Sequence, residues 1–286
     1  MDNFIPLDKS WMIRVGMLDI LNSCDDIIKF LEKQSALGDD LQALLRCAHD
    51  WNGDMPLDVG ESGTLYRFLR FAAWKKKLNK EFLRRGTLQN RAICNDPSIV
   101  GWPLQKLLTL DDGTSQWASA SILLGNKERV QNPPYKLQLT YGAVDHWHAQ
   151  RIKGECWLPR YDETLKAQAV AYLDFLKMRK MNFVPRHSED CCFARAFGLI
   201  TPAEGERLWP GVRNHESDRF KHMEEVLGAV DCGEPIDSRD HRVVQAVVMR
   251  QKSRSLPMQV KDRAVVNKSW PQFWDFLEYC ESTKPL

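Results

Sequence analysis

The chain has almost no net charge, because 40 lysines and arginines stand against 38 aspartates and glutamates in 286 residues. Bulk attraction to nucleic acid needs a clear basic excess, so any basic site must be a local cluster. No apolar run approaches the ~20 residues that cross a bilayer, and no basic-then-apolar signal segment stands at the start. We therefore expect a cytoplasmic protein that binds neither nucleic acid nor membrane.

The eight cysteines contain no C-x-x-C pair, the spacing typical of zinc and thiol redox sites. Cys191 and Cys192 are neighbours, and neighbouring cysteines seldom form a disulfide without strain. His146 and His148 form an H-x-H that lacks a third ligand at a defined spacing. We expect reduced, buried thiols and no metal site.

Apolar residues recur every three or four positions in many short segments, which predicts numerous helices of moderate length. Helices are expected over 25–33, 39–51, 62–77, 115–124, 162–181, 190–199, 216–227, 239–252 and 271–280. Short apolar runs predict strands over 107–110, 136–140, 182–184 and 258–260. Because strands and helices alternate, the sequence predicts the α/β class, with a length suited to roughly two domains of about 150 residues.

Two expected helix starts place an arginine beside acidic residues, in the runs 214–219 (NHESDR) and 238–242 (SRDHR). The N-terminus of a helix attracts anions through its exposed N–H groups and the positive end of its dipole. A guanidinium adds a planar, two-pronged match to phosphate or carboxylate. The two runs predict a ligand with several negative charges near Arg219 and Arg242.

These two runs resemble the K-E-S-D-R and D-H-R signatures of the enolpyruvyl transferase family, in particular its 3-phosphoshikimate 1-carboxyvinyltransferases (EPSP synthases). Further segments are similar to other motifs of that family and follow in its order from Lys9 to Phe273. They are 9–14 (KSWMIR), 61–69 (ESGTLYRFL), 86–93 (GTLQNRAI), 113–116 (GTSQ) and 267–273 (NKSWPQF).

The resemblance implies a two-lobed α/β fold of repeated βαβαββ units, some of them reduced or missing because the chain is short for the family. One lobe would span 10–157 and the other 1–9 with 158–286, with the active cleft between them. The implied reaction, in aromatic amino-acid biosynthesis, transfers the enolpyruvyl group of phosphoenolpyruvate to the 5-hydroxyl of shikimate 3-phosphate and releases phosphate. It requires no metal or organic cofactor, and we expect a monomer.

The resemblance also implies residue roles. Lys9 would hold the phosphate and donate a proton, Asp190 would be the base for the acceptor hydroxyl, and Glu216 would move protons near C3. Substrate-binding roles are implied for Ser10, Arg14, Gly63, Thr64, Arg91, Thr114, Ser115, Gln116, Arg219, Arg242 and Lys268.

Two departures from the family pattern leave the activity open. Glu61 stands where the family has asparagine, and His215 stands where it has lysine, both on the acceptor side. One alternative is therefore a non-catalytic homologue that binds an anionic metabolite or a partner protein, and another is a transferase with a different acceptor. A simpler interpretation of Glu216 and Arg219 is a solvated pair one helical turn apart, worth ~0.3 kcal/mol.

Overall fold

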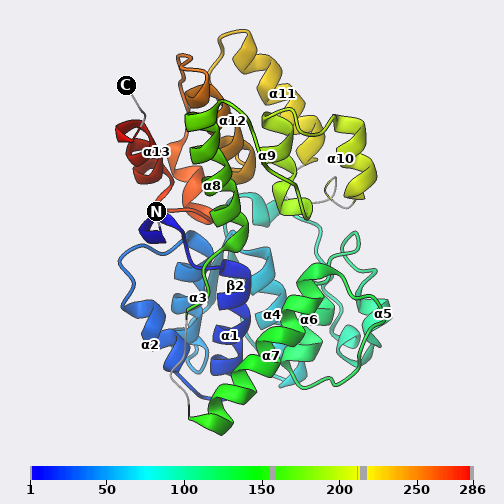
Figure 1. Ribbon diagram of the computed structural model, residues 1–286. Helices are drawn as coiled ribbons and strands as arrows, with labels where there is room; N and C mark the ends of the chain where they lie inside the picture. The colour runs from blue at the N-terminus through cyan, green and yellow to red at the C-terminus, as the bar shows by residue number, and fades with distance from the viewer. Residues whose placement is uncertain (1, 155–158, 211, 213–217, 284–286) are drawn as a thin grey trace. The chain divides into compact units, whose positions relative to one another are not determined.

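The computed structural model describes residues 2–154, 159–210, 212 and 218–283, and these residues are mostly helical (Figure 1). Helix accounts for 61% of the structure and strand for 4%, in one two-stranded sheet within the described part. An enolpyruvyl transferase fold is rich in β-sheet. The expected α/β class of repeated βαβαββ units is therefore wrong, and the resemblance to EPSP synthases fails at the level of the fold.

The chain forms two compact units. We call Leu7–Arg160 the N-terminal unit and Tyr161–Leu286, together with Met1–Pro6, the C-terminal unit. Each has its own buried apolar core, with Trp117 in the first and Trp270 in the second fully buried.

The N-terminal unit is built around α1 (Lys9–Leu21), in which every residue from Trp11 to Ile20 is buried. A helix that is apolar on nearly all sides must lie in the core, because no face of it suits water. Helices pack against it from several directions. The other elements are α2 (Asp26–Glu32), α3 (Asp39–Asp50), β1 (Leu57–Gly60), α4 (Gly63–Lys75), β2 (Phe82–Arg84), η2 (Gly86–Asn90), η3 (Pro97–Gly101), α5 (Leu104–Leu107), α6 (Gln116–Leu123) and α7 (Tyr135–Lys153).

The C-terminal unit is built around α12 (His241–Ser253), which is buried along its whole length apart from Lys252. Helix α9 packs closely against it. The other elements are η1 (Asp2–Phe4), α8 (Glu163–Met178), η4 (Ser188–Asp190), α9 (Cys191–Ala196), α10 (Pro202–Leu208), α11 (Arg219–Asp231), η6 (Arg263–Lys268) and α13 (Phe273–Ser282).

The two units share an order of elements that the sequence barely reveals. Each opens with a long helix capped by an aspartate, Asp8 for α1 and Asp162 for α8. In each unit, a buried helix connects two chain segments that pair in parallel. In the sequence of the N-terminal unit, α4 follows strand β1 and precedes its partner β2. In the C-terminal unit, α12 follows Ile236 and precedes Val260, and these two residues form a parallel bridge. Helices α4 and α12 therefore begin at corresponding places.

All nine predicted helices have a counterpart in the described structure, with ends shifted by at most four residues. The start predicted at 216 falls outside the described residues. The predicted strands are wrong, except that Val260 forms an isolated parallel bridge with Ile236. Segment 136–140 lies inside α7, whose buried residues Leu137, Thr140, Ala143 and Trp147 follow helical spacing over a longer window. Five residues are too few for apolar spacing to distinguish a strand from a helix.

No helix in the described part of the chain combines the length and the apolar character needed to cross a membrane.

Gly205 in α10 allows close packing against a buried ring. A Cβ at this position would lie 2.3 Å from Cε1 of Phe220, a residue only 3% exposed. We expect Gly205→Ala to lower the free energy of unfolding by about 1–3 kcal/mol, because the ring or the helix must shift. Urea denaturation measures this. The matched control is Gly228→Ala in α11, where a Cβ meets nothing within 4 Å, so helix propensity should raise stability by up to ~1 kcal/mol. Equal changes in both variants would contradict the packing argument.

Candidate functional site

The start of α4 in the N-terminal unit has the features of an anion site. Ser62 caps the helix, and its Oγ accepts the N–H of Leu65 at 3.4 Å. Gly63 and Thr64 are the first two residues of the helix, so their N–H groups have no carbonyl one turn earlier in the helix to bind. The positive end of the dipole of this 13-residue helix lies at the same place.

Two arginines converge on this first turn. A Cβ at Gly63 would lie 3.0 Å from Nη1 of Arg67 and 3.3 Å from Nη1 of Arg91, so the glycine leaves the space that both guanidinium groups use. Gln116 joins the group by accepting from Arg67 Nη1 at 2.7 Å and donating to Thr64 Oγ1 at 2.9 Å. We name Gly63, Thr64, Arg67, Arg91 and Gln116 the α4 cluster.

The α4 cluster holds two guanidinium groups, and that of Arg67 pairs with the buried carboxylate of Asp111. Burial lowers the pKa of Arg67, the bond from its Nε to Asp111 Oδ2 at 2.6 Å opposes that effect, and the neighbouring charge of Arg91 lowers the pKa further. Glu61 is the other carboxylate nearby, but it is exposed and accepts from the hydroxyl of Thr87. Solvent screens the exposed Glu61 more strongly than it screens the buried pair of Arg67 and Asp111.

Sequence reasoning named four members of the α4 cluster and missed Arg67. The signal existed, because Arg67 lies four residues after Gly63 and so on the same face of a helix. Its partner Asp111 gave no signal. Asp111 reaches the cluster through a turn in which Asp111, Asp112 and Gly113 all have positive φ, at 49°, 61° and 83°.

Thr114 and Ser115 immediately precede α6, the helix that carries Gln116. Ser115 stands at the N-cap position without a capping side-chain bond. No bond from either side chain to the α4 cluster is present in the described structure, so their substrate-binding roles stay predictions.

The residues predicted at the start of α1 hold helices together. Lys9 Nζ lies 2.8 Å from Asp40 Oδ2 on α3, and Ser10 Oγ accepts from Lys136 Nζ on α7 at 2.9 Å. Arg14 is 1% exposed and donates to Thr140 Oγ1 and to two backbone carbonyls, and burial lowers its pKa to about 10. Each of its nitrogens already has a protein acceptor, so the geometry favours a structural role for Arg14.

In the C-terminal unit, predicted residues gather around the start of α12. Arg219 Nε donates to Asp240 Oδ2 at 2.8 Å, and both side chains are 5% exposed or less. Asp240 also caps α12 by accepting the N–H of Arg242 at 2.9 Å. Arg242 Nη2 lies 3.0 Å from Glu189 Oε2 and 3.8 Å from Asp162 Oδ2. We name Asp162, Glu189, Arg219, Asp240 and Arg242 the α12 network.

The α12 network is largely self-compensating. Burial alone would raise the pKa of Asp240, but the Arg219 charge and hydrogen bond hold it below its usual range. One feature of Arg242 is not compensated, since its Nε and Nη1 are buried and have no hydrogen-bond partner among the described residues. Unpaired buried donors are costly and uncommon. The five named side chains nevertheless hold three carboxylates against two guanidinium groups, so the α12 network favours no added anion.

The other predicted residues of this unit are not members of the α12 network. Asp190 is buried, and its carboxylate accepts from Gln168 Nε2 and from the N–H of Arg186, both at 2.9 Å. Lys268 ends η6 and is buried. Glu216, together with the departure at His215, lies outside the described residues. The roles of Asp190 as a base and Glu216 as a proton shuttle stay predictions.

Within the described residues, no group of three or more histidine, cysteine, aspartate or glutamate side chains is placed to hold a metal ion. His146 instead lies 5.5 Å from the Trp11 ring, measured between ring centroids.

Comparison of the chain with models of protein families, with curated proteins and with solved structures found no match.

Proposed function

We propose that the protein binds a small anionic metabolite through a phosphate or carboxylate group at the α4 cluster. The observation that carries the proposal is the convergence of Arg67 and Arg91 on Gly63 in the first turn of a long helix. Helix N-termini and paired guanidinium groups are both established ways for proteins to hold such groups.

The donors of the α4 cluster suit a planar or tetrahedral anion. The hydroxyl of Ser62 accepts the N–H of Leu65, and the N–H groups of Gly63 and Thr64 then remain for a ligand. Arg67 is fixed by Asp111 through Nε and by Gln116 through Nη1, so its orientation is set before a ligand arrives. A preorganised site of this kind binds more tightly because little side-chain entropy is lost on binding.

Enolpyruvyl transfer from phosphoenolpyruvate to shikimate 3-phosphate stays a prediction of the motifs alone. It loses its main support with the family fold, and the acid–base pair of Asp190 and Glu216 has no described geometry. Anion binding requires only the α4 cluster and does not depend on membership of that family. We therefore favour binding over transfer.

Arg91→Ala is expected to weaken binding of phosphate and of phosphoenolpyruvate by roughly 10- to 150-fold. This corresponds to the ~1.5–3 kcal/mol carried by a hydrogen bond to a charged group. Isothermal titration calorimetry measures the affinity. The matched control is Arg129→Ala, which removes an arginine from the same unit whose side chain is 62% exposed, and it should leave the affinity unchanged.

Gly63→Ala provides a second variant that keeps both charges but places a Cβ between the two guanidinium groups. It should also weaken binding. Unchanged affinity in both variants, or no saturable binding of either anion to the unaltered protein, would refute the site. An assay of phosphate released from phosphoenolpyruvate and shikimate 3-phosphate separates the two functions, since turnover would establish transfer and binding without turnover would exclude it for this acceptor.

A further inference from the structure

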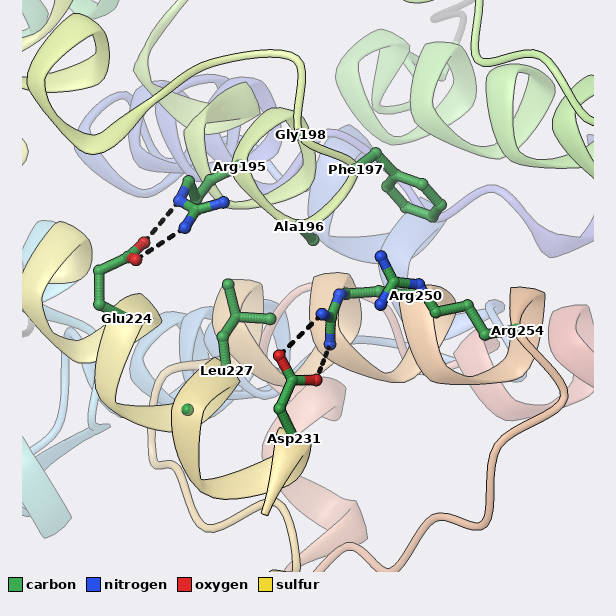
Figure 2. A pocket seen from close by; sticks show the side chains of 10 residues that line it. Arg195, Ala196, Phe197, Gly198, Glu224, Leu227, Asp231, Arg250 and Arg254 are labelled. Carbon is green, nitrogen blue, oxygen red and sulfur yellow. Dashed lines mark hydrogen bonds and ion pairs between the residues drawn. The ribbon is translucent and has the colours of Figure 1, made fainter. Parts of the chain in front are cut away.

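A pocket of about 310 Å³ opens in the C-terminal unit between α9, α11 and the end of α12 (Figure 2). It is separate from the α4 cluster, which belongs to the other unit, and shares no lining residue with the α12 network. Its volume falls at the lower end of the range of about 300–1,000 Å³ typical of small-molecule sites.

Two bidentate ion pairs build the charged walls of this pocket (Figure 2). Arg195 on α9 bonds Glu224 on α11 at 2.5 and 2.7 Å, and Arg250 on α12 bonds Asp231 at the end of α11 at 2.8 and 3.0 Å. The hydrogen bonds from Arg250 lower the pKa of Asp231, which keeps that carboxylate ionised. Both carboxylates are thus engaged by arginines of the wall and are poorly suited to bind a cation.

The exposed Arg254 contributes a third guanidinium, which forms no bidentate pair but helps to lower the pKa of Asp231 through its charge. Arg254 directly follows α12, and its side chain reaches back toward Phe197 and Arg250 (Figure 2). No hydrogen bond or ion pair joins the Arg254 side chain to any described residue. Three guanidinium groups against the carboxylates of Glu224 and Asp231 leave an excess of one positive charge in the lining.

Phe197 and Leu227 add a smaller apolar part to a lining that is mainly polar. The ring of Phe197 and the side chain of Leu227 face the same hollow as Arg254. An unpaired guanidinium beside exposed carbon surface is suited to a ligand with one charged end and an apolar body, because the charge fixes orientation while burial of carbon contributes affinity.

We propose that this pocket binds a small organic monoanion, with a carboxylate paired to Arg254 and an apolar or aromatic body against Phe197 and Leu227. A doubly charged phosphate fits less well, since its second charge would face Glu224 and Asp231 without a compensating cation. The site is independent of the α4 cluster and its proposed function.

Benzoate is the probe, titrated by ligand-observed NMR with the full chain. We expect saturable binding, and Arg254→Ala should weaken it about tenfold or more because one charged hydrogen-bonding group is lost. Benzamide, which has the same shape without the charge, should bind at least about tenfold more weakly than benzoate. The matched control is Arg239→Ala, an exposed arginine just before the other end of α12, which should bind benzoate as the unaltered protein does.

Absence of saturable benzoate binding, equal affinity for benzamide, or unchanged affinity in Arg254→Ala would each overturn the proposal. Phosphate binding to Arg254→Ala should match that of the unaltered protein. Failure of this pocket and failure of the α4 cluster are therefore distinguished by separate variants and separate probes.

Discussion

Arg219→Ala is expected to lower the free energy of unfolding by about 3–5 kcal/mol, the range for breaking a buried ion pair. Arg219 and Asp240 are 5% and 1% exposed in their side chains, and their 2.8 Å bond joins the starts of α11 and α12. Removing the guanidinium leaves the buried Asp240 carboxylate without its main ion-pair partner. Urea denaturation at neutral pH measures the loss.

The pH dependence gives a sharper test of the same pair. In the intact protein the folded pKa of Asp240 lies below its unfolded value of about 3.9, so the stabilisation is complete above that pH and is lost as the pH falls toward the folded pKa. In Arg219→Ala, the largest influence that lowers the pKa of Asp240 is lost while burial, which raises it, remains together with the weaker opposing effects of His241 and the N–H of Arg242. We expect the folded pKa to rise above the unfolded value because burial is then the dominant influence. The contribution of Asp240 should then reverse sign, so that lowering the pH toward 4 recovers stability.

Two controls separate this effect from general loss of contacts. Arg195→Ala breaks a similar pair whose side chains are 25% and 39% exposed, and it should cost no more than about 1 kcal/mol. Adding Asp240→Asn to Arg219→Ala should recover part of the loss, because it removes the stranded charge and keeps a capping residue. Equal losses for Arg219→Ala and Arg195→Ala would show that burial of the pair does not matter.

Trp117→Ala is expected to lower the free energy of unfolding of the N-terminal unit by about 3–5 kcal/mol, since a fully buried tryptophan leaves a large cavity. Trp117 is 0% exposed, and its ring stacks on Trp74 with centroids 5.8 Å apart. Far-ultraviolet circular dichroism in urea measures the loss without relying on tryptophan emission. Trp102→Ala, at a half-buried position of the same unit, should cost clearly less. Equal costs would contradict the cavity argument.

Trp117 also connects the core to the α4 cluster. Its Nε1 donates to Asp111 Oδ2 at 2.8 Å, and the same oxygen accepts from Arg67 Nε. Trp117→Phe keeps most of the packing but removes that donor, so it should cost about 1 kcal/mol in stability and weaken phosphate binding by several-fold. A change in stability without any change in phosphate affinity would show that Asp111 does not position Arg67.

The motifs that resembled a known family have a simpler physical explanation. Asp8, Ser62, Asp218 and Asp240 all cap helices by accepting N–H groups of the first turn. Capping residues, and often glycines or charged residues, are common at helix starts, so several starts can match short motifs in order without sharing the fold. The resemblance detected helix N-termini and misassigned their cause.

Sequence reasoning missed helices α1 and α7 and the two strands for different physical reasons. Helix α1 is buried on every side and so shows no apolar stripe, and an alternating run inside α7 gave a false strand. The real strands Leu57–Gly60 and Phe82–Arg84 are too short to give a periodic signal. Their parallel pairing exists only because α4 brings them together.

The sequence by itself determined where most helices begin and end, because caps and apolar spacing act over a few residues. It also named four members of the α4 cluster, of which Gly63, Thr64 and Gln116 stand at helix starts and Arg91 follows η2. Only the tertiary structure decided which cations remain available to a ligand. The guanidinium of Arg14 donates to Thr140, 126 positions away, and so is not available to a ligand. The guanidinium of Arg67 is oriented by Asp111, 44 positions away. Pairing of this kind depends on which distant segments pack together, and no local pattern records it.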